Sequence, residues 1–138
     1  MTEPNKIDFR HRRVSQISDI TDLVDMFFPG NRNQQHAAAR ILLALKAASA
    51  PVPSLSSLEN KYNISRRTLQ RTRAKLSRLG LIQRISWMNI RYNGQQGWKL
   101  SSRISTALRQ LADKIDQWRK DDQPERILKD EQLVELLK

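Results

Sequence analysis

The clearest chemical signal in this sequence is a run of positive charge that contains no carboxylate. Residues 61–103 carry 11 Lys and Arg side chains and no acidic one, whereas the whole chain of 138 residues has 14 Asp and Glu and a net charge of +11. A segment of one sign builds a field whose natural partner is a polyanion. A basic face that serves only solubility does not explain why acids are absent from one segment alone. The basic residues of the segment are Lys61, Arg66, Arg67, Arg71, Arg73, Lys75, Arg78, Arg84, Arg91, Lys99 and Arg103.

Many of these charges fall on one predicted helix, residues 66–79, whose two faces differ in character. Successive residues of a helix lie about 100° apart around its axis, so Leu69, Leu76 and Leu79 share one side. Long arginines, a glutamine and a small alanine suit a helix that enters a DNA major groove about 12 Å wide. The sequence therefore predicts that this helix reads double-stranded DNA. Its opposite face carries Arg67, Gln70, Arg71, Ala74 and Arg78.

The predicted DNA contacts are of two kinds. Arginine can hold guanine and glutamine can hold adenine through paired hydrogen bonds, so we expect Arg67, Gln70 and Arg71 to read base edges. Contacts with phosphates fix position without reading sequence. The residues expected to touch phosphates are Arg66, Arg73, Lys75 and Arg78. The predicted DNA-binding surface is completed by Ser65, the expected N-cap of the helix, together with Thr68 and Ala74.

The composition argues against catalysis and against a membrane span. The chain has no cysteine, which excludes disulfides, thiolate catalysis and cysteine zinc sites. Its two histidines, His11 and His36, belong to no metal-ligand cluster, and no phosphate loop or nucleophile motif is present. No apolar run approaches the roughly 20 residues of a membrane span. We therefore expect a cytoplasmic, nucleoid-associated protein that is not an enzyme and uses neither cofactor nor metal.

Apolar periodicity, capping residues and turn residues predict the elements that position the charged side chains. Residues 1–17 are expected to form a flexible basic arm, residues 18–101 a DNA-binding domain, and residues 102–138 helices that serve dimerisation. Within these divisions, helices are expected over about 19–28, 31–49, 54–62, 66–79, 102–120 and 124–137, with strands over 81–88 and 98–100.

This order of elements resembles the winged helix-turn-helix superfamily. Residues 55–65 look like its first helix and turn, residues 66–82 like a recognition helix with the Leu-Gly-Leu-Ile exit, and residues 98–101 like the strand that leaves the wing. The order and length are similar to those of MarR-like regulators over roughly residues 36–118, although residues 90–97 lack the Asp-x-Arg pattern frequent there. The resemblance implies a mainly α fold with a small β-wing and a role in transcription regulation.

The predicted wing, near residues 89–97, adds a second place of contact with DNA. Arg91 and Tyr92 occupy its predicted tip, and arginine is attracted to the negative potential of a narrow minor groove. A contact of Arg91 with a single phosphate is an equal alternative. Trp87 and Trp98, on the predicted strands, are expected to pack in the core.

The predicted helix after the wing repeats apolar residues at alternating spacings of four and three. This spacing is typical of the seam of a coiled coil, and the last helix adds another apolar face. We favour a homodimer formed through this face. The alternative is that the face packs on the chain's own core. A twofold dimer also predicts a palindromic DNA site. The seam residues, expected at the dimer interface, are Ile104, Leu108, Leu111, Ile115 and Trp118.

Two other functions remain open at this point. The first is the winged-helix DNA-binding domain of a phage or plasmid replication or partition protein, which shares the fold and the groove contact. The second is a winged-helix protein-interaction module, which has no reason to keep its helix 66–79 free of acids. RNA is a poorer partner than DNA, because the deep, narrow major groove of an A-form duplex does not admit a helix.

Overall fold

A computed structural model of the chain describes residues 7–86 and 95–138. The described residues form two compact units, one ending at Ser102 and the other spanning Arg103–Lys138. The fold is mainly helical with a small two-stranded antiparallel sheet, as the sequence predicted. The elements of the first unit are α1 (His11–Ser15), α2 (Ile20–Phe27), α3 (Arg32–Ala47), α4 (Ser57–Tyr62), α5 (Arg66–Leu79), β1 (Ile82–Ile85) and β2 (Gly97–Leu100), and those of the second are α6 (Arg103–Lys120) and α7 (Pro124–Glu135).

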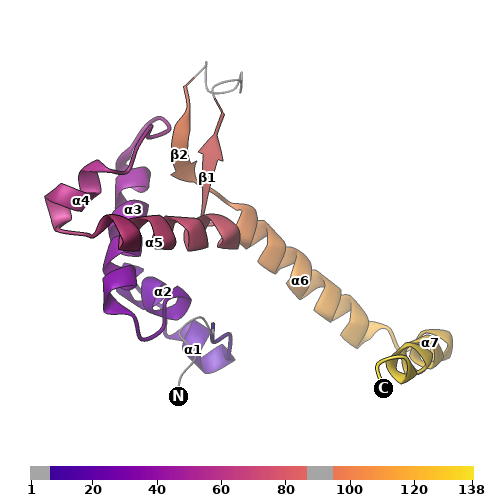
Figure 1. Cartoon of the computed structure of the whole chain (residues 1–138). Helices are drawn as coiled ribbons and strands as arrows, with labels where there is room; N and C mark the ends of the chain where they lie inside the picture. The colour runs from indigo at the N-terminus through magenta and orange to yellow at the C-terminus, as the bar shows by residue number, and fades with distance from the viewer. Residues whose placement is uncertain (1–6, 87–94) are drawn as a thin grey trace. The chain divides into compact units, whose positions relative to one another are not determined.

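Helix α3 lies at the centre of the first unit. It packs against α2, α5 and β2, and Figure 1 shows α5 crossing it. Ala37, Ala38 and Ile41 on α3 are fully buried. Because alanine side chains are short, neighbouring elements can approach the backbone of α3 closely. This packed helix gives α5 a firm support.

Side-chain caps fix where α2 and α3 begin. Asp19 accepts a hydrogen bond from the backbone N–H of Asp22 at the start of α2, and Asn31 accepts one from Gln34 at the start of α3. Each cap satisfies a backbone donor that has no partner within its own helix. These starts agree with the helices that the sequence predicted over about residues 19–28 and 31–49.

The sheet is tied to the loop before α4 by a contact that the sequence did not predict. In the β1–β2 pair Ile82 lies opposite Leu100. Trp98 on β2 also pairs with Val52 of the loop, and the two residues exchange two backbone hydrogen bonds of 2.8 Å. Gly97 makes the approach possible, because a Cβ atom there would lie 2.3 Å from the carbonyl oxygen of Val52. The φ angle of Gly97, +140°, also disfavours other residues.

Two local expectations need correction. Residues 11–15 form the short helix α1, and Arg13 pairs with Asp25 on α2, so the flexible arm expected over residues 1–17 does not extend over this stretch. Helix α4 begins at Ser57 rather than near Ser54, because the Ser54 hydroxyl bonds to the N–H of Ser56 within a turn before the helix.

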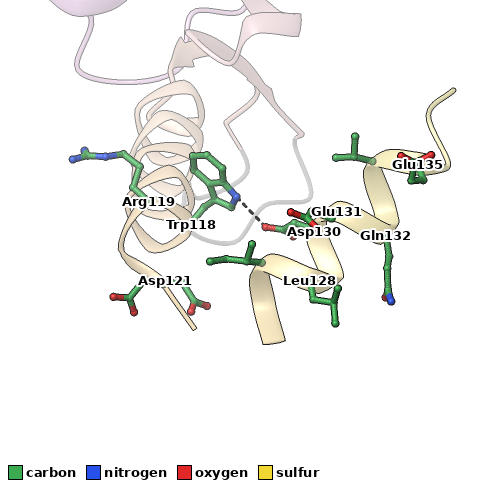
Figure 2. A pocket seen from close by; sticks show the side chains of 11 residues that line it. Trp118, Arg119, Asp121, Leu128, Asp130, Glu131, Gln132 and Glu135 are labelled. Atoms are coloured by element: carbon green, nitrogen blue, oxygen red, sulfur yellow. Dashed lines mark hydrogen bonds between the residues drawn. The ribbon is translucent and has the colours of Figure 1, made fainter. Parts of the chain in front are cut away.

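The second unit has no buried core among its helices. No residue of α6 or α7 is buried, and both helices carry large apolar side chains that are exposed. The indole N–H of Trp118 on α6 donates a hydrogen bond of 3.1 Å to a carboxylate oxygen of Asp130 on α7 (Figure 2). No helix in the described part of the chain is both long and apolar enough to span a membrane.

Candidate nucleic-acid interface

A three-residue turn between α4 and α5 sets the direction of α5. Asn63 adopts the left-handed conformation (φ 54°) that ends α4, which asparagine tolerates better than most residues. Ile64 is buried and anchors the turn to the core. Ser65 caps α5, since its hydroxyl oxygen accepts a hydrogen bond of 3.1 Å from the N–H of Thr68. Ser65 and Thr68 therefore shape the start of α5.

The inner face of α5 is buried against the other elements of the first unit. Leu69, Thr72 and Leu76 are buried, and Leu76 keeps only 1% of its surface exposed. Gly80 ends the helix in the left-handed conformation (φ 87°), and its N–H bonds back to the carbonyl groups of Leu76 and Ser77. The burial fixes the rotation of α5 about its axis, so its other face must point away from the core.

The outer face of α5 is exposed and carries only positive charge. In residues 7–86 and 95–138, none of its arginines forms an ion pair or a side-chain hydrogen bond with another described residue. Their donors are therefore available to a ligand, and guanidinium groups suit phosphates and base edges. The structure brings together here the exposed residues Arg66, Arg67, Gln70, Arg71, Ala74 and Arg78, which we call the outer face of α5.

The side chain of Lys75, which the sequence assigned to a phosphate contact, points toward the end of α2. Its ammonium group donates a hydrogen bond to the backbone oxygen of Phe27 and lies 4.6 Å from the ring centre of Phe28. Burial lowers the pKa of Lys75, and the nearby charge of Arg78 lowers it further. The side chain thus ties α5 to the end of α2 and is only partly accessible to a phosphate.

Arg73 also packs inside the first unit, against Trp98 on β2. Its guanidinium carbon lies 5.0 Å from the ring centre of Trp98 on β2, and that of Arg84 on β1 lies 5.7 Å from the same ring. Cations over an indole ring are attracted by its electron-rich face. Trp98 is buried, so it has the packing role that the sequence predicted. The pair links α5 to the sheet that carries the predicted wing.

The wing residues themselves lie outside the described residues. Arg91 and Tyr92, the predicted minor-groove contacts, and Trp87 fall in the stretch 87–94 between the two described ranges.

The structure shows a cluster of aromatic and basic side chains between α3 and α4 that the periodicity of the sequence did not predict. The guanidinium carbon of Arg40 lies 3.9 Å from the ring centre of Tyr62, and the ammonium nitrogen of Lys61 lies 5.5 Å from it. His36 meets the same ring edge-on and accepts a hydrogen bond of 3.3 Å from Arg40. His36 thus lies at the surface in a packing contact. An arginine and a tyrosine on different helices give no periodic signal in the sequence.

The predicted dimer seam occupies one side of α6 and stays largely exposed. Leu108 is the least exposed of its four C-terminal members at 40%, and Trp118 the most exposed at 68%. Ile104 is half-buried. An apolar stripe that stays exposed to solvent in this way indicates a binding surface.

Among residues 7–86 and 95–138, no three His, Asp or Glu side chains gather as metal ligands do. Comparison with protein-family models, with curated proteins and with solved structures finds no match.

Proposed function

We propose that this chain is a sequence-specific double-stranded DNA-binding protein, acting in transcription regulation, that inserts α5 into the major groove. The observation that carries the proposal is the outer face of α5, a cationic, carboxylate-free surface whose arginines have no partners within the described chain. A helix that displays cations only for solubility normally pairs them with acids one turn away, and α5 has none.

The order of the elements supports a winged helix-turn-helix interpretation of the first unit. Helix α4, a three-residue turn and α5 form two helices joined as in a helix-turn-helix, and the β1–β2 pair follows at once. The bridge between Val52 and Trp98 adds a short extended segment beside β2, before α4 in the chain. In such a domain the second helix of the motif enters the groove, and here that helix is α5.

The positions on the outer face suggest how the contacts divide. Arg67, Gln70 and Arg71 are assigned to base edges, and the small side chain of Ala74 lets the helix approach the bases. Arg66 and Arg78, near the two ends of α5, are assigned to phosphates. Arg73 and Lys75 are left out of the phosphate set, because the contacts of both side chains hold them against the first unit.

Two further parts of the proposal rest on the sequence. The wing near residues 89–97 places Arg91 and Tyr92 at the minor groove. A homodimer formed through the second unit presents two copies of α5 to a palindromic site, and chromosomal DNA is then where the protein is found.

A selection from random duplexes tests the proposal. We expect an enriched sequence, and a palindrome supports a dimeric regulator. An asymmetric or repeated site instead supports a replication or partition protein. A protein-interaction module enriches no sequence, and that outcome contradicts the proposal.

The Arg71→Ala variant tests the assignment of base contacts on the selected duplex. Loss of a bidentate base contact costs about 1–3 kcal/mol of binding free energy and relaxes the preference at one position. Arg109→Ala is the matched control, because it removes the same charge from the exposed surface of α6. Equal losses of affinity on specific and random duplexes overturn the assignment of Arg71 to a base.

A further inference from the structure

The apolar stripe of α6 lacks a cover, and its own residues indicate what covers it. Leu111 and Ile115, in the middle of the helix, keep 53% and 50% of their surface exposed. The stripe advances by four and three residues in turn, the spacing that keeps it facing a second helix along its whole length. A second helix with a similar stripe is therefore the best-fitting occupant, and every copy of this chain supplies one.

The residues beside the stripe determine how two copies of α6 can pair. Ser105, Ala112 and Arg119 follow one edge of the stripe, and Ala107 and Lys114 follow the other. In a parallel pair opposite edges of the two helices meet, so Lys114 lies beside Arg119 of the other copy. Like charges at such positions repel each other, and the twofold symmetry of a dimer doubles the repulsion.

An antiparallel pair avoids this repulsion, because each edge then meets the same edge of the other copy. One register places Leu108 against Leu111 and Ile104 against Ile115, so the four layers that these residues form are apolar, and Trp118 lies beyond them. In that register Lys114 meets Ala107. The neighbouring register, shifted by one heptad, brings Lys114 against Lys114 and is disfavoured.

The other edge fits the same register. Arg119 meets Ser105, and Ala112 of one copy meets Ala112 of the other. The small side chains along both edges allow the two backbones to approach closely.

Helix α7 extends the surface that such a pair offers. A stable interface buries roughly 1,200–2,000 Å² in total, and two short helices alone supply only the lower part of that range. In Figure 2, Trp118 points from α6 toward Asp130 on α7, and Leu128 lies beside the hollow between the two helices. The hydrogen bond joins the two helices, and the exposed side chains of Leu128 and Val134 on α7 line the same hollow as Trp118, so apolar surface continues from α6 onto α7.

We propose that a second copy of this chain covers the apolar stripe of α6, running antiparallel to the first. The twofold axis passes near residue 110, with Leu108 of each copy packed against Leu111 of the other. The proposal rests on the homodimer of the proposed function and names its contact, but the pairing needs no DNA, so its failure is distinguishable from a failure of DNA binding.

Distances between two identical spin labels test the direction of pairing in the full chain. The chain has no cysteine, so a single cysteine gives one labelled site per copy. Gln110→Cys and Gln117→Cys are matched sites, since they lie two helical turns apart on the same polar side of α6, off the stripe. Labels at 110 lie near the axis, whereas labels at 117 are offset along the helix by about 14 residues, or about 21 Å.

The antiparallel pair predicts that the distance between labels at 117 exceeds the distance at 110 by roughly 10 Å, once the axial offset combines with the lateral spacing. Equal distances at the two sites indicate a parallel pair and overturn the proposal. Absence of dipolar coupling at both sites, in variants whose circular dichroism matches the parent chain, also overturns it. Adding Leu111→Glu to the Gln110→Cys chain must abolish the coupling, and persistence of the coupling shows that another surface pairs.

Discussion

Helices α5 and α6 are both amphipathic, and they differ in which face remains open. Leu69 and Leu76 on the inner face of α5 are buried, and its exposed face carries arginines. The leucines of α6 are exposed, and its polar face mixes acids with bases that pair along the helix, as Arg119 does with Asp116. The open face of each helix indicates its partner: a polyanion for α5 and another apolar helix for α6.

The largest expected difference between the two helices concerns stability. Leu76→Ala on α5 leaves a cavity in a packed core and lowers the free energy of unfolding by about 2–5 kcal/mol. Leu111→Ala on α6, measured by urea denaturation at protein concentrations too low for dimers, changes it by less than about 1 kcal/mol. Similar losses for the two variants mean that the stripe of α6 is covered within the single chain.

The second difference concerns assembly. Sedimentation of the parent chain is expected to give the mass of a dimer, and Leu111→Glu the mass of a monomer, because a charge in the stripe has no partner when buried. Gln110→Glu is the control, since it adds the same charge at the neighbouring position off the stripe and is expected to leave the dimer intact. An unchanged profile for Leu111→Glu rules out the seam.

Lys75 marks the boundary between the two faces of α5. Lys75→Ala removes the hydrogen bond to Phe27 and the contact with Phe28, so we expect a loss of about 1 kcal/mol in the free energy of unfolding. Its affinity for a selected duplex is expected to stay within about twofold of the parent, unlike that of Arg71→Ala. If Lys75→Ala weakens binding to all duplexes alike and leaves stability unchanged, the lysine contacts phosphate after all.

The smallest expected effect concerns the buried side of α5. Thr72 is fully buried, and its hydroxyl has no hydrogen-bond partner among the described residues. Thr72→Val replaces this hydroxyl with a methyl group of similar shape, so thermal unfolding is expected to show a change within about 1 kcal/mol, neutral or stabilising. A clear destabilisation indicates that the hydroxyl has a partner, such as a bound water.

Local signals in the sequence predicted much of this structure. The cap Ser65 and the stop at Gly80 act on neighbouring backbone atoms, so residue type and position were enough to place α5. The inner face of α5 followed from the helical period of its leucines, and the exposed arginines followed from the same geometry.

Contacts between segments distant in the chain could not be predicted from the sequence. The position of Lys75 on the helical wheel allows either a phosphate or the end of α2 as its partner, and only the packing of α2 against α3 brings the Phe27 carbonyl within reach. The bridge between Val52 and Trp98 joins single residues 46 positions apart, without a periodic pattern in either segment. Long side chains and isolated bridges depend on tertiary neighbours that no local window contains.

The most direct test of the central claim is the affinity of the full chain for a selected duplex at two salt concentrations. Two phosphate contacts, from Arg66 and Arg78, predict that raising monovalent salt from about 50 to about 200 mM weakens binding by about tenfold, and a dimer by more. The Arg66→Ala variant is expected to bind more weakly with a shallower salt dependence. Absence of duplex binding even in dilute buffer, or an affinity that does not change with salt, contradicts the proposal that the outer face of α5 binds DNA.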